Sequence, residues 1–242
     1  MNIFQSIDYA AIAKIVGIDL MLGVDNAIVI ALACAALPSD LRRRAILLGT
    51  LGAIVLRAIL LAGAGYLMGV PYLKLVAGLY LVYLGYKLLS ADEGDEDHNI
   101  VAADRVFAAV KTVIVADFMM SLDNVLAVAG AAQSAGAHST LYAIAGIVLS
   151  IPVIVFGATG LSTLMNRFPV IVWLGGGLLG WVGAEMVLGD HGLAIPVGAL
   201  TASIGEHTHV LVKLAGFAGV LSAALLMKYA AKPATVTSKV EI

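Results

Sequence analysis

The chain has 242 residues, of which 61% are apolar and only 12% are charged, and its mean hydropathy is +1.01. An ordinary soluble domain carries about 25% charged residues, so this composition excludes that class and indicates a membrane protein. The net charge of −2 without a long basic run argues against nucleic acid as a partner, and the single cysteine, Cys34, excludes a disulfide framework or a multi-cysteine zinc site.

Apolar runs separated by short polar breaks predict seven transmembrane helices, because a span needs about 20 apolar residues. The first residues lack a basic region, so we expect no cleaved signal and insertion through the first helix. The acidic stretch 91–99 is predicted to be a solvated loop, and the Pro- and Gly-containing stretch 192–206 a surface or re-entrant segment. The expected spans are 9–36, 45–69, 71–89, 107–132, 140–165, 169–188 and 208–228.

Lysine and arginine are distributed unevenly between the two sides that these spans define. If the turn at 36–45, with three consecutive arginines, faces the cytoplasm, ten of the fourteen basic residues fall on that side. The opposite turns, 133–139 and 189–207, contain none. The positive-inside rule therefore predicts that the N-terminus lies outside and the C-terminus lies in the cytoplasm.

The chain also contains an internal repeat. The pattern Asp-x-Met-x-x-x-Asp-Asn begins at Asp19 and again at Asp117, an offset of 98 residues. The repeated unit is three helices, and an odd number of spans makes the second copy enter the membrane from the opposite side. This predicts an inverted-topology pair, as in many secondary transporters, whose substrate sites lie near the midplane between the copies. Further matched pairs are Pro71 with Pro169, Gly78 with Gly176, Gly85 with Gly183 and, after a one-residue slip, Gly49 with Gly146 and Gly63 with Gly160.

The predicted fold is an all-α polytopic membrane protein with a 3+3 inverted repeat plus one extra helix. Little of the length remains for a separate soluble domain. The expected parts are a first three-helix repeat at 1–89, a cytoplasmic acidic loop at 90–106, a second repeat at 107–188, an outer segment with the seventh helix at 189–229, and a cytoplasmic tail at 230–242.

Each copy of the motif places acidic and amide side chains inside an otherwise apolar helix. Burying an ionised aspartate costs at least about 2.5–3.5 kcal/mol, so four of them indicate that a cation is shared. Carboxylate, amide and carbonyl oxygens suit a hard or borderline divalent ion such as Mg²⁺, Ca²⁺ or Mn²⁺. The predicted metal ligands are Asp19, Asp25, Asn26, Asp117, Asp123 and Asn124.

Helix geometry limits how these groups converge. Asp19 and Asn26 are seven residues apart and share a helix face, whereas Asp25 is turned from it by about 120°. A straight helix does not focus all three groups. We therefore expect local unwinding at Gly23 and, in the second copy, at Ser121.

Four further side chains are candidate auxiliaries. Met21 and Met119 both follow the first aspartate of a motif by two residues. Thioether ligands would favour Mn²⁺ over Mg²⁺ and Ca²⁺, whereas packing between helices is the simpler explanation. Arg57, near the middle of the second span, would neutralise one aspartate and hold the empty site together. Glu185 would act as a gate or a proton carrier.

Carboxylates that lie this close cannot all be ionised, so the metal-free site is expected to hold protons that metal binding expels. Exporting a divalent ion against an inside-negative potential costs about 4.6 kcal/mol per 100 mV, from about 2.3 per charge, so an exporter needs a coupled gradient. The expected partners are the bilayer, the divalent metal and protons, with no bound organic cofactor. The coupling ratio and a homo-oligomeric state stay open.

Two segments resemble the paired signatures of the TerC family of integral membrane proteins. They are Gly-Val-Asp-Asn-Ala at 23–27 and Ser-Leu-Asp-Asn-Val-Leu-Ala-Val-Ala-Gly at 121–130, and the short N-terminus resembles the YjbE-type branch. The resemblance covers about 9–228. It implies a bacterial inner-membrane protein of the lysine-exporter-like superfamily, associated with manganese efflux and, in some members, with tellurium resistance or metal supply to exported proteins. It also implies a functional role for the six predicted ligands.

Other functions fit the residues less well. An intramembrane aspartyl protease needs one asymmetric aspartate pair, whereas this chain has two equivalent motifs. A retinal protein built on Lys213 would have an aspartate where His209 stands, and a carrier of an organic amine would need an aromatic cage. A Ca²⁺ or other divalent exchanger stays the alternative to Mn²⁺, and export is implied by the resemblance alone.

Overall fold

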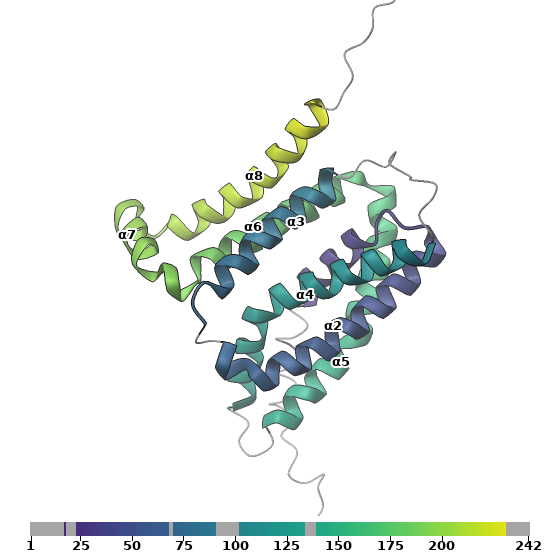
Figure 1. The fold of residues 1–242 in the computed structure, drawn as a ribbon, viewed down its shortest axis with the longest axis horizontal. Coiled ribbons are helices and arrows are strands. Elements are labelled where there is room, and N and C mark those ends of the chain that lie inside the picture. The colour runs from purple at the N-terminus through teal and green to yellow at the C-terminus, as the bar shows by residue number, and fades with distance from the viewer. Residues whose placement is uncertain (1–16, 18–22, 68–69, 91–101, 134–138, 231–242) are drawn as a thin grey trace, which may run out of the picture.

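A computed structural model of the chain describes residues 17, 23–67, 70–90, 102–133 and 139–230. Within these ranges the chain forms helices joined by turns and contains no strand (Figure 1). A first helix covers Gly23–Ala33. It is followed by α2 (Ser39–Leu67), α3 (Leu73–Ser90), α4 (Ala102–Gln133), α5 (Ser139–Arg167), α6 (Pro169–Leu188), the 3₁₀ helix η3 (His191–Leu193), α7 (Ala194–Ile204) and α8 (Thr208–Ala230).

Two helices begin earlier than the predicted spans. α2 begins at Ser39, so Arg42 lies in a helix and not in a turn. Its side chain donates hydrogen bonds to the carbonyl oxygens of Ala35 (2.7 Å) and Leu37 (3.1 Å), just after the first helix. Arg42 therefore satisfies two carbonyl groups of the turn that joins the first helix to α2. α4 begins at Ala102, so the end of the expected acidic loop is helical.

The segment predicted to lie on the surface or re-enter the membrane forms η3 and α7. Pro196 falls in the first turn of α7, where the missing N–H costs no helical hydrogen bond. The charged part of the acidic loop and the tail after Ala230 lie outside the described residues.

Four described helical segments are long and apolar enough to cross a bilayer. They are Ser39–Gly63, Leu73–Ser90, Pro169–Leu188 and Thr208–Ala230, and two shorter apolar helices cover Gly23–Ala33 and His191–Ile204. α4 and α5 contain 32 and 29 residues, more than the roughly 20 that one span requires. The architecture is therefore that of an all-helical membrane protein with several spans.

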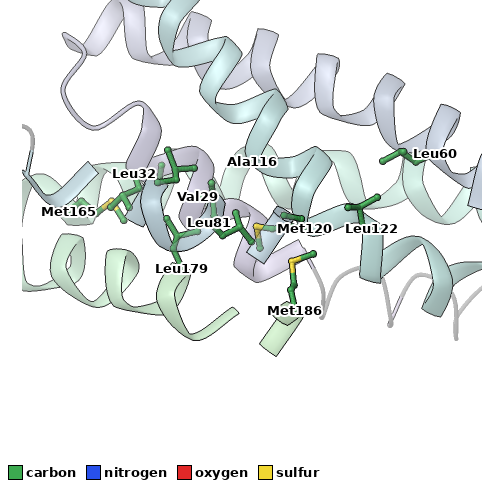
Figure 2. Packing of buried hydrophobic residues seen from close by; sticks show 13 residues of the cluster. Val29, Leu32, Leu60, Leu81, Ala116, Met120, Leu122, Met165, Leu179 and Met186 are labelled. Carbon is green, nitrogen blue, oxygen red and sulfur yellow. The ribbon is translucent and has the colours of Figure 1, made fainter. Parts of the chain in front are cut away.

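The helices form two groups that pack on each other (Figure 1). α3 lies along α6 with α8 against both, and α2 lies along α4 with α5 against both. The main core lies between the groups. Figure 2 shows its buried side chains as a row from Met165 to Leu60, with Val29, Leu81 and Met120 between them.

Glycines allow α3 and α6 to approach very closely. A Cβ atom added at Gly78 would lie 2.3 Å from the carbonyl oxygen of Gly183, and one at Gly183 would lie 2.5 Å from that of Gly78. Further along the same contact, a Cβ atom at Gly85 would lie 2.7 Å from the carbonyl oxygen of Gly176. The two backbones touch, which is typical of helix packing in membranes.

Asp190 joins the turn after α6 to the start of α3. Its buried carboxylate accepts hydrogen bonds from the N–H groups of Tyr72 (3.0 Å), Leu75 (3.0 Å) and Gly192 (2.7 Å). Burial raises the pKa of the Asp190 carboxyl, but the backbone N–H donors outweigh burial and bring that pKa below its usual value. Tyr72 adopts a φ of 63°, and its ring lies 2.6 Å from where a Cβ atom at residue 192 would be, so a larger residue there would displace the ring.

Candidate metal centre

Residues from both copies of the motif meet where the first helix packs against α4. Asn26 comes from the first copy and Asp117 from the second, and both line one narrow crevice together with Met120. The side chains of Asn26 and Asp117 are buried, at 2% and 5% exposure. The fold therefore places an amide and a carboxylate from the two motifs beside each other, away from water.

The carboxylate of Asp117 is held by two other buried side chains. Nη2 of Arg57, from α2, donates a hydrogen bond to Oδ1 of Asp117 at 2.7 Å. The hydroxyl of Ser121, one turn further along α4, donates to Oδ2 at 3.0 Å, and Nε of Arg57 donates to that hydroxyl at 3.2 Å. A buried carboxylate requires such partners, since an unpaired charge in this environment is very costly.

Asn26 differs from Asp117 in having no such partners. Its Oδ1 and Nδ2 are buried and have no hydrogen-bond partner among the described residues, and the same is true of Oγ1 of Thr50. Thr50 lines a second crevice with Arg57 and Asp117. A buried polar group without a partner costs about 1–3 kcal/mol, so these two groups next to one carboxylate are candidate ligand groups.

Asp25 lies in an adjoining crevice. It is half-buried and lines this third crevice with Gly175 and Val182 of α6. Met120 and Val29 line both this crevice and the one at Asn26. The structure thus brings Asn26 and Asp117 together and directs Asp25 toward α6.

The other predicted ligands are described in part or not at all. Asp19, Met21 and the side chain of Asp123 lie outside the described residues, and Asn124 is half-buried on α4. The described part of the chain holds no group of three or more His, Cys, Asp or Glu side chains that could bind a metal. The two predicted acids whose side chains it describes are Asp25 and Asp117.

The predicted unwinding at Ser121 is wrong. α4 is helical from Ala102 to Gln133, through Ser121. The Ser121 hydroxyl bridges Asp117 and Arg57, so the polar groups meet without breaking the backbone hydrogen bonds of the helix. Gly23 is also helical, and the residues directly before it lie outside the described part.

Thr50, Met120 and Ser121 lie at the site but are not among the ligands predicted from the sequence. Helical spacing is the signal that could have found them. Met120 and Ser121 follow Asp117 by three and four residues, and Thr50 precedes Arg57 by seven, so each shares a helix face with a predicted residue. The repeated Met119, in contrast, packs partly buried against the main core.

Glu185 is not among the residues that line these three crevices. Its carboxylate lies on the exposed side of α6 and forms an ion pair with Nζ of Lys213 in α8. The same Nζ lies 5.7 Å from the centre of the Trp181 ring. Glu185 therefore links α6 to α8, and its role as a gate or proton carrier stays a prediction.

The helices and the buried polar site between them define an integral membrane protein with several spans. The chain belongs to the TerC family: the family model described as "Integral membrane protein TerC family" matches residues 4–234. This confirms the family that the two motif segments resemble.

Several bacterial membrane proteins are similar to the chain. It is 42% identical to the "Uncharacterized membrane protein YjbE" of Bacillus subtilis over 181 residues, 75% of this chain and 80% of that protein. It is 25% identical to the "UPF0053 inner membrane protein YgdQ" of Escherichia coli K12, covering 78% and 85% of the two chains. It is 27% identical to the "UPF0053 protein YegH" of the same strain, of which it spans 40%. No solved structure matches the chain.

Proposed function

We propose that this protein transports a divalent metal ion, Mn²⁺ in particular, out of the cell across the bacterial inner membrane in exchange for protons. The observation that carries the proposal is the pair formed by Asn26 and Asp117. An amide whose two buried polar atoms have no hydrogen-bond partner among the described residues lines the same crevice as a buried carboxylate.

The chemistry of the crevices favours a divalent metal. The amide oxygen of Asn26 and the carboxylate of Asp117 are hard oxygen donors, which Mg²⁺, Ca²⁺ and Mn²⁺ all accept. The thioether of Met120 lines the same crevice, and a sulfur donor shifts preference toward Mn²⁺. The remaining proposed ligands are Asp19, Asp25, Asp123 and Asn124.

Seven spans and an inverted 3+3 repeat belong to this proposal. By the repeat offset of 98, Gly78 corresponds to Gly176 and Gly85 to Gly183. In the structure Gly78 lies against Gly183, which is the counterpart of Gly85. Gly85 in turn lies against Gly176, which is the counterpart of Gly78. A two-fold axis produces such reciprocal contacts, which supports an axis in the membrane plane between α3 and α6. The seven spans are then the first helix, α2 to α6, and α8.

Proton exchange and orientation complete the proposal. Several acidic groups in one site cannot all be ionised without a cation, so metal binding displaces protons. Moving a divalent ion outward against the membrane potential costs about 4.6 kcal/mol per 100 mV, from about 2.3 per charge, and entering protons supply this energy. The distribution of lysine and arginine supports an N-terminus outside and a C-terminus in the cytoplasm.

Reconstituted protein tests the proposal. Proteoliposomes that contain a pH-sensitive dye are given Mn²⁺ or Ca²⁺, and metal flux and proton flux are recorded together. We expect Mn²⁺ flux with opposite proton flux in the wild type and its loss in Asp25→Asn and Asp123→Asn. Ser162→Ala, which removes a buried hydroxyl in α5, is the control and should transport normally.

Three results would contradict parts of the proposal. Unchanged Mn²⁺ flux in both aspartate variants would contradict the metal site. Mn²⁺ flux without proton movement would contradict exchange. Transport of Ca²⁺ with no transport of Mn²⁺ would make the protein a calcium exchanger.

A further inference from the structure

Arg57 already supplies a positive charge to the carboxylate that the proposed function assigns to the metal. The side chain is 5% exposed, and its guanidinium contacts both Asp117 and Ser121. We propose that Arg57 is a tethered cation. Its guanidinium pairs with the carboxylate of Asp117 when no metal is bound, and it moves away from that carboxylate when the metal binds. This inference rests on the proposed function and assigns Arg57 a role in setting metal affinity.

Both oxygens of the Asp117 carboxylate are occupied in the structure. Oδ1 accepts from Nη2 of Arg57, and Oδ2 accepts from the hydroxyl of Ser121. A metal ion would have to share this carboxylate with the guanidinium. Two cations on one buried carboxylate repel each other strongly, because the protein interior screens charge poorly. The metal and the guanidinium therefore exclude each other.

The crevice beside Arg57 offers the released guanidinium another acceptor. Thr50 lies seven residues before Arg57 on the same face of α2, and both line this crevice with Asp117. Oγ1 of Thr50 is buried and has no hydrogen-bond partner in the described part of the chain. Side chains on a helix lean toward its N-terminus, which is the direction of Thr50 from Arg57. A guanidinium displaced from Asp117 can donate a hydrogen bond to that hydroxyl.

The tethered cation is present in one half of the repeat. With the one-residue slip, Arg57 corresponds to Ile154 in the second copy, and Ser121 corresponds to Gly23 in the first. Arg57 contacts Ser121, and Ile154 lies beside Gly23, where an added Cβ atom would be 3.2 Å from its Cγ1. The same contact thus occurs twice, with a guanidinium in one copy and an aliphatic side chain in the other. The two halves therefore do not offer equal positions to a metal.

Equilibrium binding to the purified full-length protein tests this role. Free Mn²⁺ is measured by electron paramagnetic resonance during titration of the wild type, Arg57→Gln and Arg57→Lys. We expect Arg57→Gln to bind Mn²⁺ at least roughly tenfold more tightly, as competition between two cations requires, and Arg57→Lys to stay near the wild type. Arg167→Gln, which removes one positive charge that lies 5.8 Å from the centre of the Phe168 ring at the end of α5, should bind as the wild type does.

Two measurements keep the test decisive if Arg57→Gln does not fold. In Arg57→Ala, added guanidinium chloride should weaken Mn²⁺ binding, whereas it should leave the wild type unaffected. In the wild type, the side-chain Nε–H signal of Arg57, assigned with Arg57→Lys, should change its chemical shift when a diamagnetic divalent metal such as Mg²⁺ or Cd²⁺ binds, because the hydrogen bond from Nε to Ser121 is lost.

The outcomes separate this inference from the proposed function. Weaker or unchanged Mn²⁺ binding in folded Arg57→Gln, or an Arg57 signal that does not shift in the metal-bound wild type, would overturn the tethered-cation role while the metal site stands. Absence of metal binding by the wild type and by every variant would overturn both.

Discussion

The carboxylate of Asp117 and the amide of Asn26 line the same buried crevice, yet they differ in how their polar atoms are satisfied. Asp117 accepts two side-chain hydrogen bonds, whereas both polar atoms of Asn26 have no partner in the part of the chain that the structure describes. A fold optimised for stability alone would place an apolar side chain at position 26. The amide is therefore explained best by what it binds.

Replacing Asn26 should separate stability from transport. In Asn26→Leu, the loss of two unsatisfied polar atoms should raise the free energy of unfolding by about 1 kcal/mol, while Mn²⁺ flux falls at least roughly tenfold. Ser162→Ala removes another unsatisfied buried group and should be stabilised without loss of flux. Titration with sodium dodecyl sulfate in micelles measures the free energy of unfolding, and the liposome assay measures Mn²⁺ flux. A destabilised Asn26→Leu that still transports would contradict this account of the site.

The ion pair between Arg57 and Asp117 should show strong coupling. Arg57→Met alone leaves a buried carboxylate without its cation and should lower the free energy of unfolding by about 3–5 kcal/mol. The double variant Arg57→Met/Asp117→Leu should recover part of that loss, because it removes the Asp117 carboxylate that the single variant leaves without this cation. A double-mutant cycle measured in micelles checks this, and additive effects of the two changes would show that the pair is not a unit.

The close contact of α3 and α6 should not tolerate a single added methyl group. Gly183→Ala places a Cβ atom 2.5 Å from the carbonyl oxygen of Gly78, so the helices must separate, at a cost of about 1–3 kcal/mol in the free energy of unfolding. Gly219→Ala is the matched control, since a Cβ atom there meets nothing within 4 Å. Equal effects of the two substitutions on unfolding would contradict the described contact.

The hydrogen bonds of Asp190 predict a pH dependence of stability. Because the folded-state pKa of this carboxyl lies below its ordinary value of 3.8, its contribution is complete above that pH and is lost as the pH falls through the lower folded-state value. Asp190→Ala should cost about 1–3 kcal/mol at neutral pH and should remove this part of the acid sensitivity. Thermal unfolding at a series of pH values, with the exposed-residue variant Glu206→Ala as control, measures both effects. An unchanged pH profile in Asp190→Ala would contradict the assignment.

Much of the helical framework can be predicted from the sequence, because transmembrane helices must be apolar and therefore appear as long apolar stretches. The motif repeat likewise predicts that Asn26 and Asp117 are polar exceptions inside apolar helices. The choice of Asp117 as the partner of Arg57 cannot be predicted in this way, since it depends on which helix face of α4 meets α2. The role of Ser121 is also a matter of packing: its hydroxyl joins two charged groups across an unbroken helix, which removes the need for the predicted unwinding.

The position of a bound Mn²⁺ ion would show whether Asn26 and Asp117 hold the metal. Crystals of the full chain grown with Mn²⁺ would be measured on both sides of the manganese absorption edge, and the anomalous difference map would locate the ion. We expect a peak in contact with Oδ1 of Asn26 and a carboxylate oxygen of Asp117, with the guanidinium of Arg57 turned away. A peak elsewhere in the molecule, with Arg57 still bonded to Asp117, would contradict it.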